Sequence, residues 1–172
     1  MAIDLQPAFA HPDSPWFTPA LEAVTGLIER LVPKFSDRVL FTRFVPPAAP
    51  WGSWQPYYDK AAWALHPSAN HLWALDARWA GRPRIDKHTF SKWGPEARQS
   101  IDVDDVVVLC GVSTDCCVLM TAPAAMDDGA HVRVVADACA AKSTAMHQQA
   151  LAVLAGRAPQ LRITTVAEEL AA

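Results

Sequence analysis

The chain has 172 residues and a mass of 18.7 kDa, a length that suits one compact domain, and we expect a single domain over residues 1–172. Hydrophobic residues make up 51% of the chain and charged residues 19%, which excludes a mainly disordered protein. The formal net charge is −3, and the chain contains no run of lysines or arginines. Nucleic-acid binding through a basic face is therefore not expected.

Membrane insertion and secretion are also not expected. The longest uninterrupted apolar stretch, Val106 to Val112, falls far short of the ~20 residues that span a bilayer. The first residues have no cationic region and include an acid, Asp4, so they do not resemble a signal peptide. The four cysteines form no CxxC pair, which predicts a reduced thiol protein of the cytoplasm.

Short β-branched runs alternate with amphipathic segments in the first half of the chain. A strand over residues 1–5 precedes a helix over residues 18–33, which begins at a Thr-Pro pair and carries apolar residues at helical spacing. A second strand spans residues 38–42. A long loop rich in proline and tryptophan follows up to about residue 63, and residues 70–79 are expected to form a short helix.

The second half of the chain continues this alternation. Strands are predicted over residues 84–88, 105–110, 131–136 and 161–164, and helices over residues 114–128 and 143–154. The run DVVVLC is typical of a strand that is buried on both faces. Strands that alternate with helices pair in parallel through right-handed crossovers, so we expect a three-layer α/β/α sandwich with an open, mostly parallel sheet.

Three reactive side chains follow three of these strands. Asp4 lies near the end of the first strand, Lys87 ends the third, and Cys117 comes just after the fourth, where a helix begins. Ligands of open parallel sheets bind beyond the carboxyl ends of the strands. The sequence therefore predicts that an acid, a cation and a thiol meet at one edge of the sheet.

These side chains suit nucleophilic catalysis. A helix N-terminus and the nearby ammonium of Lys87 would favour the thiolate of Cys117. Asp4 could accept the thiol proton and pass it to a leaving group. Backbone N–H groups in the turn that contains Val112 and Ser113 could hold an oxyanion.

Three ordered motifs carry a resemblance to a known family. They are Ile3-Asp4-Leu5-Gln6 near the start, Asp86-Lys87-His88-Thr89-Phe90-Ser91 in the middle, and GVSTDCCV over residues 111–118. With their spacing over nearly the whole chain, they resemble the signatures of the isochorismatase-like cysteine hydrolases.

This resemblance implies an isochorismatase-like hydrolase fold in which Asp4, Lys87 and Cys117 form the catalytic triad. It also implies a cis peptide bond before Ser113 that helps to build the oxyanion hole. Members of the family are usually homo-oligomers, so a dimer or tetramer is expected.

The remaining candidates concern substrate binding. Gln6 could bind the active-site loop or simply the backbone, whereas Phe9 and Trp93 are candidates for the pocket wall. Arg43 ends the second strand at the same edge and could hold a substrate carboxylate. We expect Cys116 to be a packing residue that points away from the site.

Two further expectations concern a competing lysine and bound metal. Lys92 competes with Lys87 for the catalytic role, but its place in a predicted loop indicates a surface side chain. The six histidines show no ligand spacing, and the segment after the second strand contains no histidine. The sequence therefore predicts neither a metal nor a cofactor.

The favoured interpretation is a metal-independent cysteine hydrolase that cleaves a small amide-like substrate through a thioester on Cys117, with Asp4 as general acid and base and Lys87 as electrostatic partner. The first alternative is an isochorismatase-type hydrolase of a vinyl ether, in which Asp4 protonates the substrate. The second is a catalytically silent, oligomeric binding protein. A redox role for Cys116 and Cys117 is disfavoured because adjacent cysteines form a strained ring.

Overall fold

The computed structural model describes residues 1–102 and 105–172. Within these ranges, six strands form one parallel sheet in the order β3-β2-β1-β4-β5-β6. The strands are β1 (Ala2–Ile3), β2 (Phe41–Phe44), β3 (Arg84–Lys87), β4 (Val106–Val112), β5 (His131–Ala140) and β6 (Leu161–Thr164). The predicted fold class is therefore confirmed, and every predicted strand is present.

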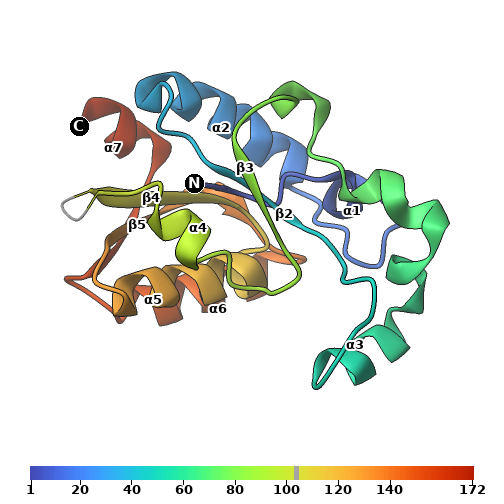
Figure 1. Cartoon of the computed structure of the whole chain (residues 1–172). Coiled ribbons are helices and arrows are strands. Elements are labelled where there is room, and N and C mark those ends of the chain that lie inside the picture. Colours follow the sequence, from blue (N-terminus) through green and yellow to red (C-terminus); the bar gives the residue numbers. More distant parts are fainter. Residues whose placement is uncertain (103–104) are drawn as a thin grey trace.

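Helices cover both faces of this sheet (Figure 1). The α-helices are α1 (Pro7–Ala10), α2 (Leu21–Phe35), α3 (Trp54–Lys60), α4 (Pro95–Arg98), α5 (Leu119–Asp127), α6 (Thr144–Ala155) and α7 (Val166–Ala171). Helices α2 and α7 lie on one face, and α4, α5 and α6 lie on the other. No helix in the described part of the chain is both long enough and apolar enough to cross a membrane.

The helical periodicity of α2 explains its place on the sheet. The apolar residues that the sequence spaces three or four apart are buried, namely Leu21, Val24, Ile28 and Leu31. They belong to the core cluster on that face, whereas α5 and α6 contribute to a second cluster on the opposite face. Apolar burial of this kind is the main stabilising contribution to a packed layer.

The long aromatic segment between β2 and β3 is largely helical. It contains α3 and three short 3₁₀ helices, η1 (Ala62–Leu65), η2 (Pro67–Trp73) and η3 (Ala77–Trp79). The predicted helix over residues 70–79 is thus replaced by two 3₁₀ turns. Aromatic rings interlock within this segment, and Trp16 contacts both Trp63 and Trp73, with centroid separations of 4.9 and 5.5 Å.

The sheet register explains why one edge carries the reactive groups. Ile3 of β1 pairs with Gly111 of β4, so β1 and β4 end side by side. A side chain at residue 111 would bring its Cβ within 2.2 Å of the Ile3 carbonyl oxygen, and the backbone there has a φ of 112°. Glycine is therefore required where these two central strands meet.

Candidate active site

Asp4 follows β1 directly and is completely buried. Its backbone has a φ of 53°, an uncommon conformation for a residue other than glycine. The Thr42 hydroxyl of β2 donates to Asp4 Oδ1 at 2.7 Å and accepts from the Asp4 N–H at 3.2 Å. This reciprocal pair fixes the carboxylate at the carboxyl end of the sheet.

Lys92 supplies the cation beside this acid. Its Nζ lies 3.0 Å from Asp4 Oδ2, and both side chains have no exposed surface. The ammonium also donates to the Thr89 carbonyl at 2.9 Å and lies 4.7 Å from the centre of the Phe44 ring. These contacts offset the cost of burying the charge.

Asp4 Oδ2 keeps accepting capacity despite this ion pair. The Lys92 ammonium is close, but its direction does not make a well-aligned hydrogen bond, and no other described donor reaches the atom. A buried carboxylate oxygen without a hydrogen bond is costly. It is therefore available to accept a proton from a neighbouring group such as the Cys117 thiol.

The position of Lys92 corrects the sequence prediction that Lys87 lies next to Asp4. Lys87 ends β3, but its ammonium pairs with the exposed carboxylate of Glu96. The prediction that Lys92 is a surface side chain is wrong. The Lys92 N–H donates to the Thr121 hydroxyl of α5 at 2.9 Å, and this contact draws the loop after β3 into the interior.

Cys117 lies in the turn between β4 and α5, as the sequence predicts, and is 3% exposed. The turn is a π-helical segment, η4 (Thr114–Val118), in which the Val118 N–H donates to the Ser113 carbonyl at 3.1 Å. The Thr121 hydroxyl donates to the Cys117 carbonyl at 2.6 Å. Thr121 therefore anchors the segments that carry Lys92 and Cys117.

The thiol of Cys117 is protonated in the resting site. Its hydrogen bond to Cys116, its burial and the negative charge of Asp4 together raise the pKa of Cys117 well above the ordinary value, and the ammonium of Lys92 opposes this shift only in part. These surroundings disfavour the resting thiolate that we expected from the helix N-terminus and the ammonium of Lys87. Attack by Cys117 requires an acceptor for its proton.

The turn before Cys117 is tied down by side chains. The peptide bond between Val112 and Ser113 is cis, as the resemblance implied. The Ser113 hydroxyl donates to Asp115, and the Thr114 hydroxyl lies 2.9 Å from Nδ1 of His147 on α6. These contacts hold the backbone that the sequence singled out for an oxyanion.

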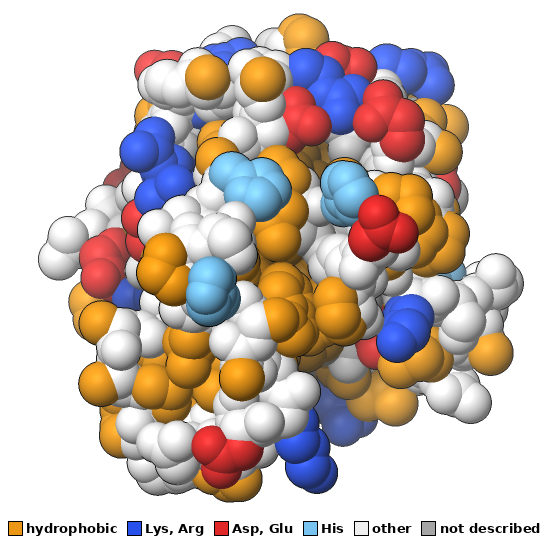
Figure 2. Space-filling model, turned by 90° about the vertical axis from the view of Figure 1, so that its right-hand side faces the viewer, with side chains coloured by type: hydrophobic (Ala, Val, Ile, Leu, Met, Phe, Trp, Pro, Cys, Tyr) orange, Lys and Arg blue, Asp and Glu red, His pale blue; other side chains and the backbone are white. Residues whose placement is uncertain are grey.

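A cavity of about 180 Å³ opens beside this turn. Its wall consists mainly of aromatic and apolar side chains, with a few polar groups near Cys117. The lining residues are Phe9, Pro15, Trp16, Thr18, Phe44, Tyr57, Phe90, Ser113, Asp115, Cys116, Cys117, Lys142 and Met146. Figure 2 shows apolar side chains gathered in the hollow at the middle of the face that Figure 1 presents on its right, with histidines and charged side chains around them.

Of the residues predicted to bind substrate, some line the cavity and others make contacts within the protein. Phe9 lines the cavity. Gln6 binds the backbone, because its amide donates to the carbonyls of Phe44 and Trp73 at 3.0 and 2.9 Å and accepts from the Phe44 N–H at 2.7 Å. Arg43 pairs with Asp86 and lies outside the cavity lining, so its guanidinium is already engaged.

Trp93 and Cys116 also differ from expectation. Trp93 lies outside the cavity lining, and its indole N–H donates to Asp128 at 2.9 Å. Cys116 is half-buried and lines the same cavity as Cys117, so the prediction that it points away is wrong. We did not predict the aromatic wall that Trp16, Tyr57 and other residues form around the cavity. The seven tryptophans of the chain were the sequence feature that could have indicated it.

The described residues contain no preformed cluster of metal ligands. Across residues 1–102 and 105–172, no three or more His, Cys, Asp or Glu side chains gather in a way that could hold an ion. The absence of metal and cofactor stays a prediction from the sequence.

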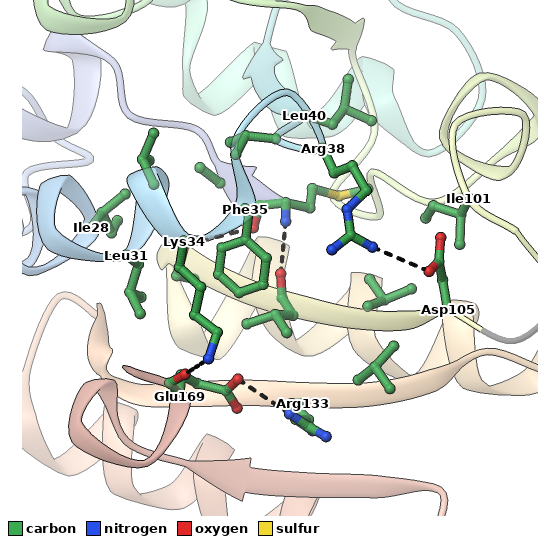
Figure 3. Close-up of a pocket in the computed structure, with 18 of the residues that line it drawn as sticks. Ile28, Leu31, Lys34, Phe35, Arg38, Leu40, Ile101, Asp105, Arg133 and Glu169 are labelled. Carbon is green, nitrogen blue, oxygen red and sulfur yellow. Dashed lines mark hydrogen bonds and ion pairs between the residues drawn. The ribbon is translucent and has the colours of Figure 1, made fainter. Parts of the chain in front are cut away.

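A second and larger cavity, of about 540 Å³, lies at the opposite end of the sheet. Its walls come from α2, the amino ends of β1 and β4, and the C-terminal helix (Figure 3). Lys34 reaches the Glu169 carbonyl, Arg133 pairs with the Glu169 carboxylate at 3.3 Å, and Arg38 lies 3.5 Å from Asp105. The side chains of Lys34, Arg38 and Arg133 therefore already have partners on the wall.

Comparisons with known proteins agree with this architecture. The sequence profile of the isochorismatase domain matches residues 1–168. An isochorismatase domain-containing protein 2 from Xenopus laevis is 35% identical over 82 residues, which are 46% of this chain and 38% of that protein. The chain thus aligns with well under half the length of this relative.

Solved structures with the same fold include two enzymes. A cysteine hydrolase from Pseudomonas syringae pv. phaseolicola has a TM-score of 0.81 at 17% identity, covering 97% of this chain and 87% of that one. A pyrazinamidase/nicotinamidase from Streptococcus mutans has a TM-score of 0.69 at 25% identity, covering 94% and 97%. With the profile match over nearly its whole length, the chain belongs to the isochorismatase domain family.

Proposed function

We propose that this protein is a cysteine hydrolase that cleaves a small amide through a thioester on Cys117. The observation that carries this proposal is the placement of Cys117 on the wall of a cavity, with the Asp4 carboxylate close enough to raise the pKa of its thiol. A nucleophile and a proton acceptor within reach of one cavity are the minimal requirements for acyl transfer.

In the first step, Asp4 takes the proton from the Cys117 thiol while the sulfur attacks the amide carbon. A carbon–sulfur bond forms, and the carbonyl electrons move onto oxygen. Backbone N–H groups of the turn that begins at Val112 and Ser113 are the donors for this oxyanion. The free accepting capacity of Asp4 Oδ2 supports its role as the base.

In the second step, the tetrahedral intermediate collapses. The carbonyl re-forms, the carbon–nitrogen bond breaks, and protonated Asp4 gives its proton to the leaving ammonia or amine. Water then attacks the thioester and its proton passes to Asp4. The carbon–sulfur bond breaks, and protonated Asp4 returns the proton to the departing sulfur of Cys117. The products are a carboxylic acid and the restored thiol of Cys117.

Lys92 acts as a positioning residue in this proposal. It contacts Asp4 rather than the cavity, and its ammonium holds the carboxylate that must accept the proton through a 3.0 Å ion pair. When Asp4 is protonated during the reaction, the ion pair weakens, which favours return of the proton. Lys92 thus takes the role that the sequence assigned to Lys87.

The cavity wall supports a flat, compact substrate. About 180 Å³ bordered by aromatic rings suits a small planar group beside the amide. The printed name of the Streptococcus mutans structure, a pyrazinamidase/nicotinamidase, adds support for amide chemistry on this fold. We further propose that the protein acts as a homo-oligomer in the cytoplasm.

Ammonia release from a panel of primary aromatic and aliphatic amides tests the proposal. Wild type should release ammonia from at least one amide, and both Cys117→Ala and Asp4→Asn should be inactive on it. Turnover of isochorismate that survives Cys117→Ala but not Asp4→Asn would favour the vinyl-ether alternative. Binding of a small molecule without turnover would favour a silent binding protein.

A further inference from the structure

Cys116 is a thiol in the site that the proposed reaction does not use. It is half-buried and lines the same cavity as Cys117. The other two cysteines, Cys110 in β4 and Cys139 in β5, lie outside that lining. The cavity therefore has two adjacent thiols in its wall, of which one is unassigned.

The π-helical turn carries the two thiols at consecutive positions. The N–H groups of Cys116 and Val118 both donate to the Ser113 carbonyl at 3.1 Å, which gives a wide turn. Cys116 and Cys117 both line the cavity of about 180 Å³. The side chain of Cys116 is also the largest cause of the raised pKa of Cys117, so the two thiols interact. Both residues thus line one small cavity from consecutive positions of the turn.

A disulfide is a poor outcome for this pair. Both cysteines are free thiols, and the peptide bond that joins them is trans. Adjacent Cα atoms lie about 3.8 Å apart across a trans peptide, which is below the roughly 4.4–6.8 Å that disulfides require. Two free thiols that line one cavity, yet are poorly placed for a mutual bond, are suited to hold a third atom between them.

We propose that Cys116 and Cys117 together bind a trivalent arsenical that carries one organic group. Soft thiolate ligands prefer soft, thiophilic centres. Trivalent arsenic is pyramidal and binds two thiolates at close to a right angle, which suits two thiols on one cavity wall. Copper(I) with two thiolates favours a linear arrangement, which consecutive cysteines do not offer.

The binding step balances without an oxidant or a reductant. For an arsenical of the form R–As=O, both S–H bonds break, two As–S bonds form, and the oxygen leaves as water with the two thiol protons. Arsenic stays trivalent and both sulfurs keep their oxidation state. The protonated resting state of Cys117 is therefore a competent starting point.

The cavity accounts for the organic group. Phe9, Tyr57 and Phe90 are among the aromatic residues that border the space next to the two thiols, so an aryl or methyl substituent on arsenic has an apolar wall to pack against. Occupancy of Cys117 would block the proposed hydrolysis. Binding itself does not depend on that activity and is measured without any substrate.

Phenylarsine oxide is the probe for this site. Intact protein is treated with one equivalent, and the fraction that carries one phenylarsenic group is followed by mass spectrometry during exposure to excess 2-mercaptoethanol. Because the second thiol acts at high effective concentration, the wild-type adduct should persist roughly 100-fold longer than that of Cys116→Ser or Cys116→Ala. The dithiol 2,3-dimercaptopropanol should remove it.

Cys110→Ser is the matched control. Its adduct should keep the wild-type lifetime, because Cys110 does not line the cavity that Cys116 and Cys117 share. Thermal melting of each variant shows that it is folded. A wild-type adduct that the monothiol removes as fast as from Cys116→Ser would overturn the proposal. An adduct mapped by peptide analysis to Cys110 or Cys139 would overturn it as well.

Discussion

The two ends of the sheet differ in cavity size and in chemistry, and the larger cavity is not the one that holds the reactive groups. The amino end has the larger space, about 540 Å³, and the carboxyl end has about 180 Å³. In the larger cavity the charged groups of Lys34, Arg38 and Arg133 already have partners on the wall (Figure 3). The smaller cavity borders a thiol and lies near a carboxylate oxygen without a hydrogen bond.

A thiol beside a carboxylate oxygen that lacks a hydrogen bond indicates a reactive site more clearly than the volume of a cavity does. Parallel strands end together, so the turns after them bring side chains from distant segments to one place. At the amino end, the lysine and arginine side chains of the cavity wall already have partners, so little charge is left to act on a substrate.

Replacing the thiol at each end should affect turnover very differently. Cys117→Ala should lower the rate of amide hydrolysis by roughly 10⁴- to 10⁶-fold, because removal of a nucleophile removes the covalent route. Cys110→Ala, in the wall of the larger cavity, should keep turnover near wild type. Steady-state ammonia release measures both, and equal losses in the two variants would refute the distinction.

Breaking the ion pair at each end should separate them in stability. Lys92→Met leaves the fully buried Asp4 carboxylate unpaired and should lower the free energy of unfolding by about 3–5 kcal/mol. Arg133→Met also leaves a buried carboxylate, that of Glu169, without its ion pair. Arg133 is 36% exposed, however, and solvent screens this pair, so the loss should be smaller, about 1–2 kcal/mol. Urea unfolding measures both, with Lys87→Met as a control that should stay near wild type, because its partner Glu96 is exposed.

Removing the hydroxyl that holds Asp4 should have an intermediate effect. Thr42→Val deletes the 2.7 Å hydrogen bond to Asp4 Oδ1 within a fully buried site and should cost about 1.5–3 kcal/mol of stability. The remaining carboxylate should also be less well oriented, so kcat should fall more than KM rises. A change in KM alone would indicate that Thr42 affects binding rather than the position of the base.

High pH should destabilise the protein through thiols at both ends. Burial raises the pKa of Cys110, and the hydrogen bond to Cys116 together with burial raises the pKa of Cys117. In the unfolded chain these thiols ionise near pH ~8.5, so above that pH the unfolded state binds fewer protons than the folded state.

The resulting stability is fully present below pH ~8.5 and should decline above it by up to about 1 kcal/mol per pH unit for each thiol. Urea unfolding in a reducing buffer at several pH values measures the slope. Cys110→Ser should reduce that slope. At lower pH, where the thiols are protonated in both states, the stability of this variant should differ from wild type only through the change in packing. A stability that is flat with pH would contradict the buried, protonated state of these thiols.

Much of this architecture could be predicted from the sequence because it depends on local patterns. β-branched runs and helical spacing located the strands and α2, and the rule for parallel sheets placed Asp4 and Cys117 at one edge. The short helix α7 was missed because its six residues give little periodicity.

The lysine could not be assigned by the same reasoning. Lys87 and Lys92 are five residues apart, and the choice depends on the path of the loop after β3. That path is fixed by the Thr121 hydroxyl on a distant helix, a contact that spacing does not reveal. The prediction that Trp93 lines the pocket was wrong for a related reason. Its side chain reaches Asp128, while that of its neighbour Lys92 turns inward to Asp4.

The most direct test of the central claim is the pH dependence of Cys117 alkylation by iodoacetamide in wild type and in Asp4→Asn. The negative charge of Asp4 helps to raise the pKa of Cys117, so its removal should shift the alkylation midpoint to lower pH while amide hydrolysis is lost. A midpoint that stays unchanged or moves to higher pH would contradict a coupled site of Asp4, Lys92 and Cys117.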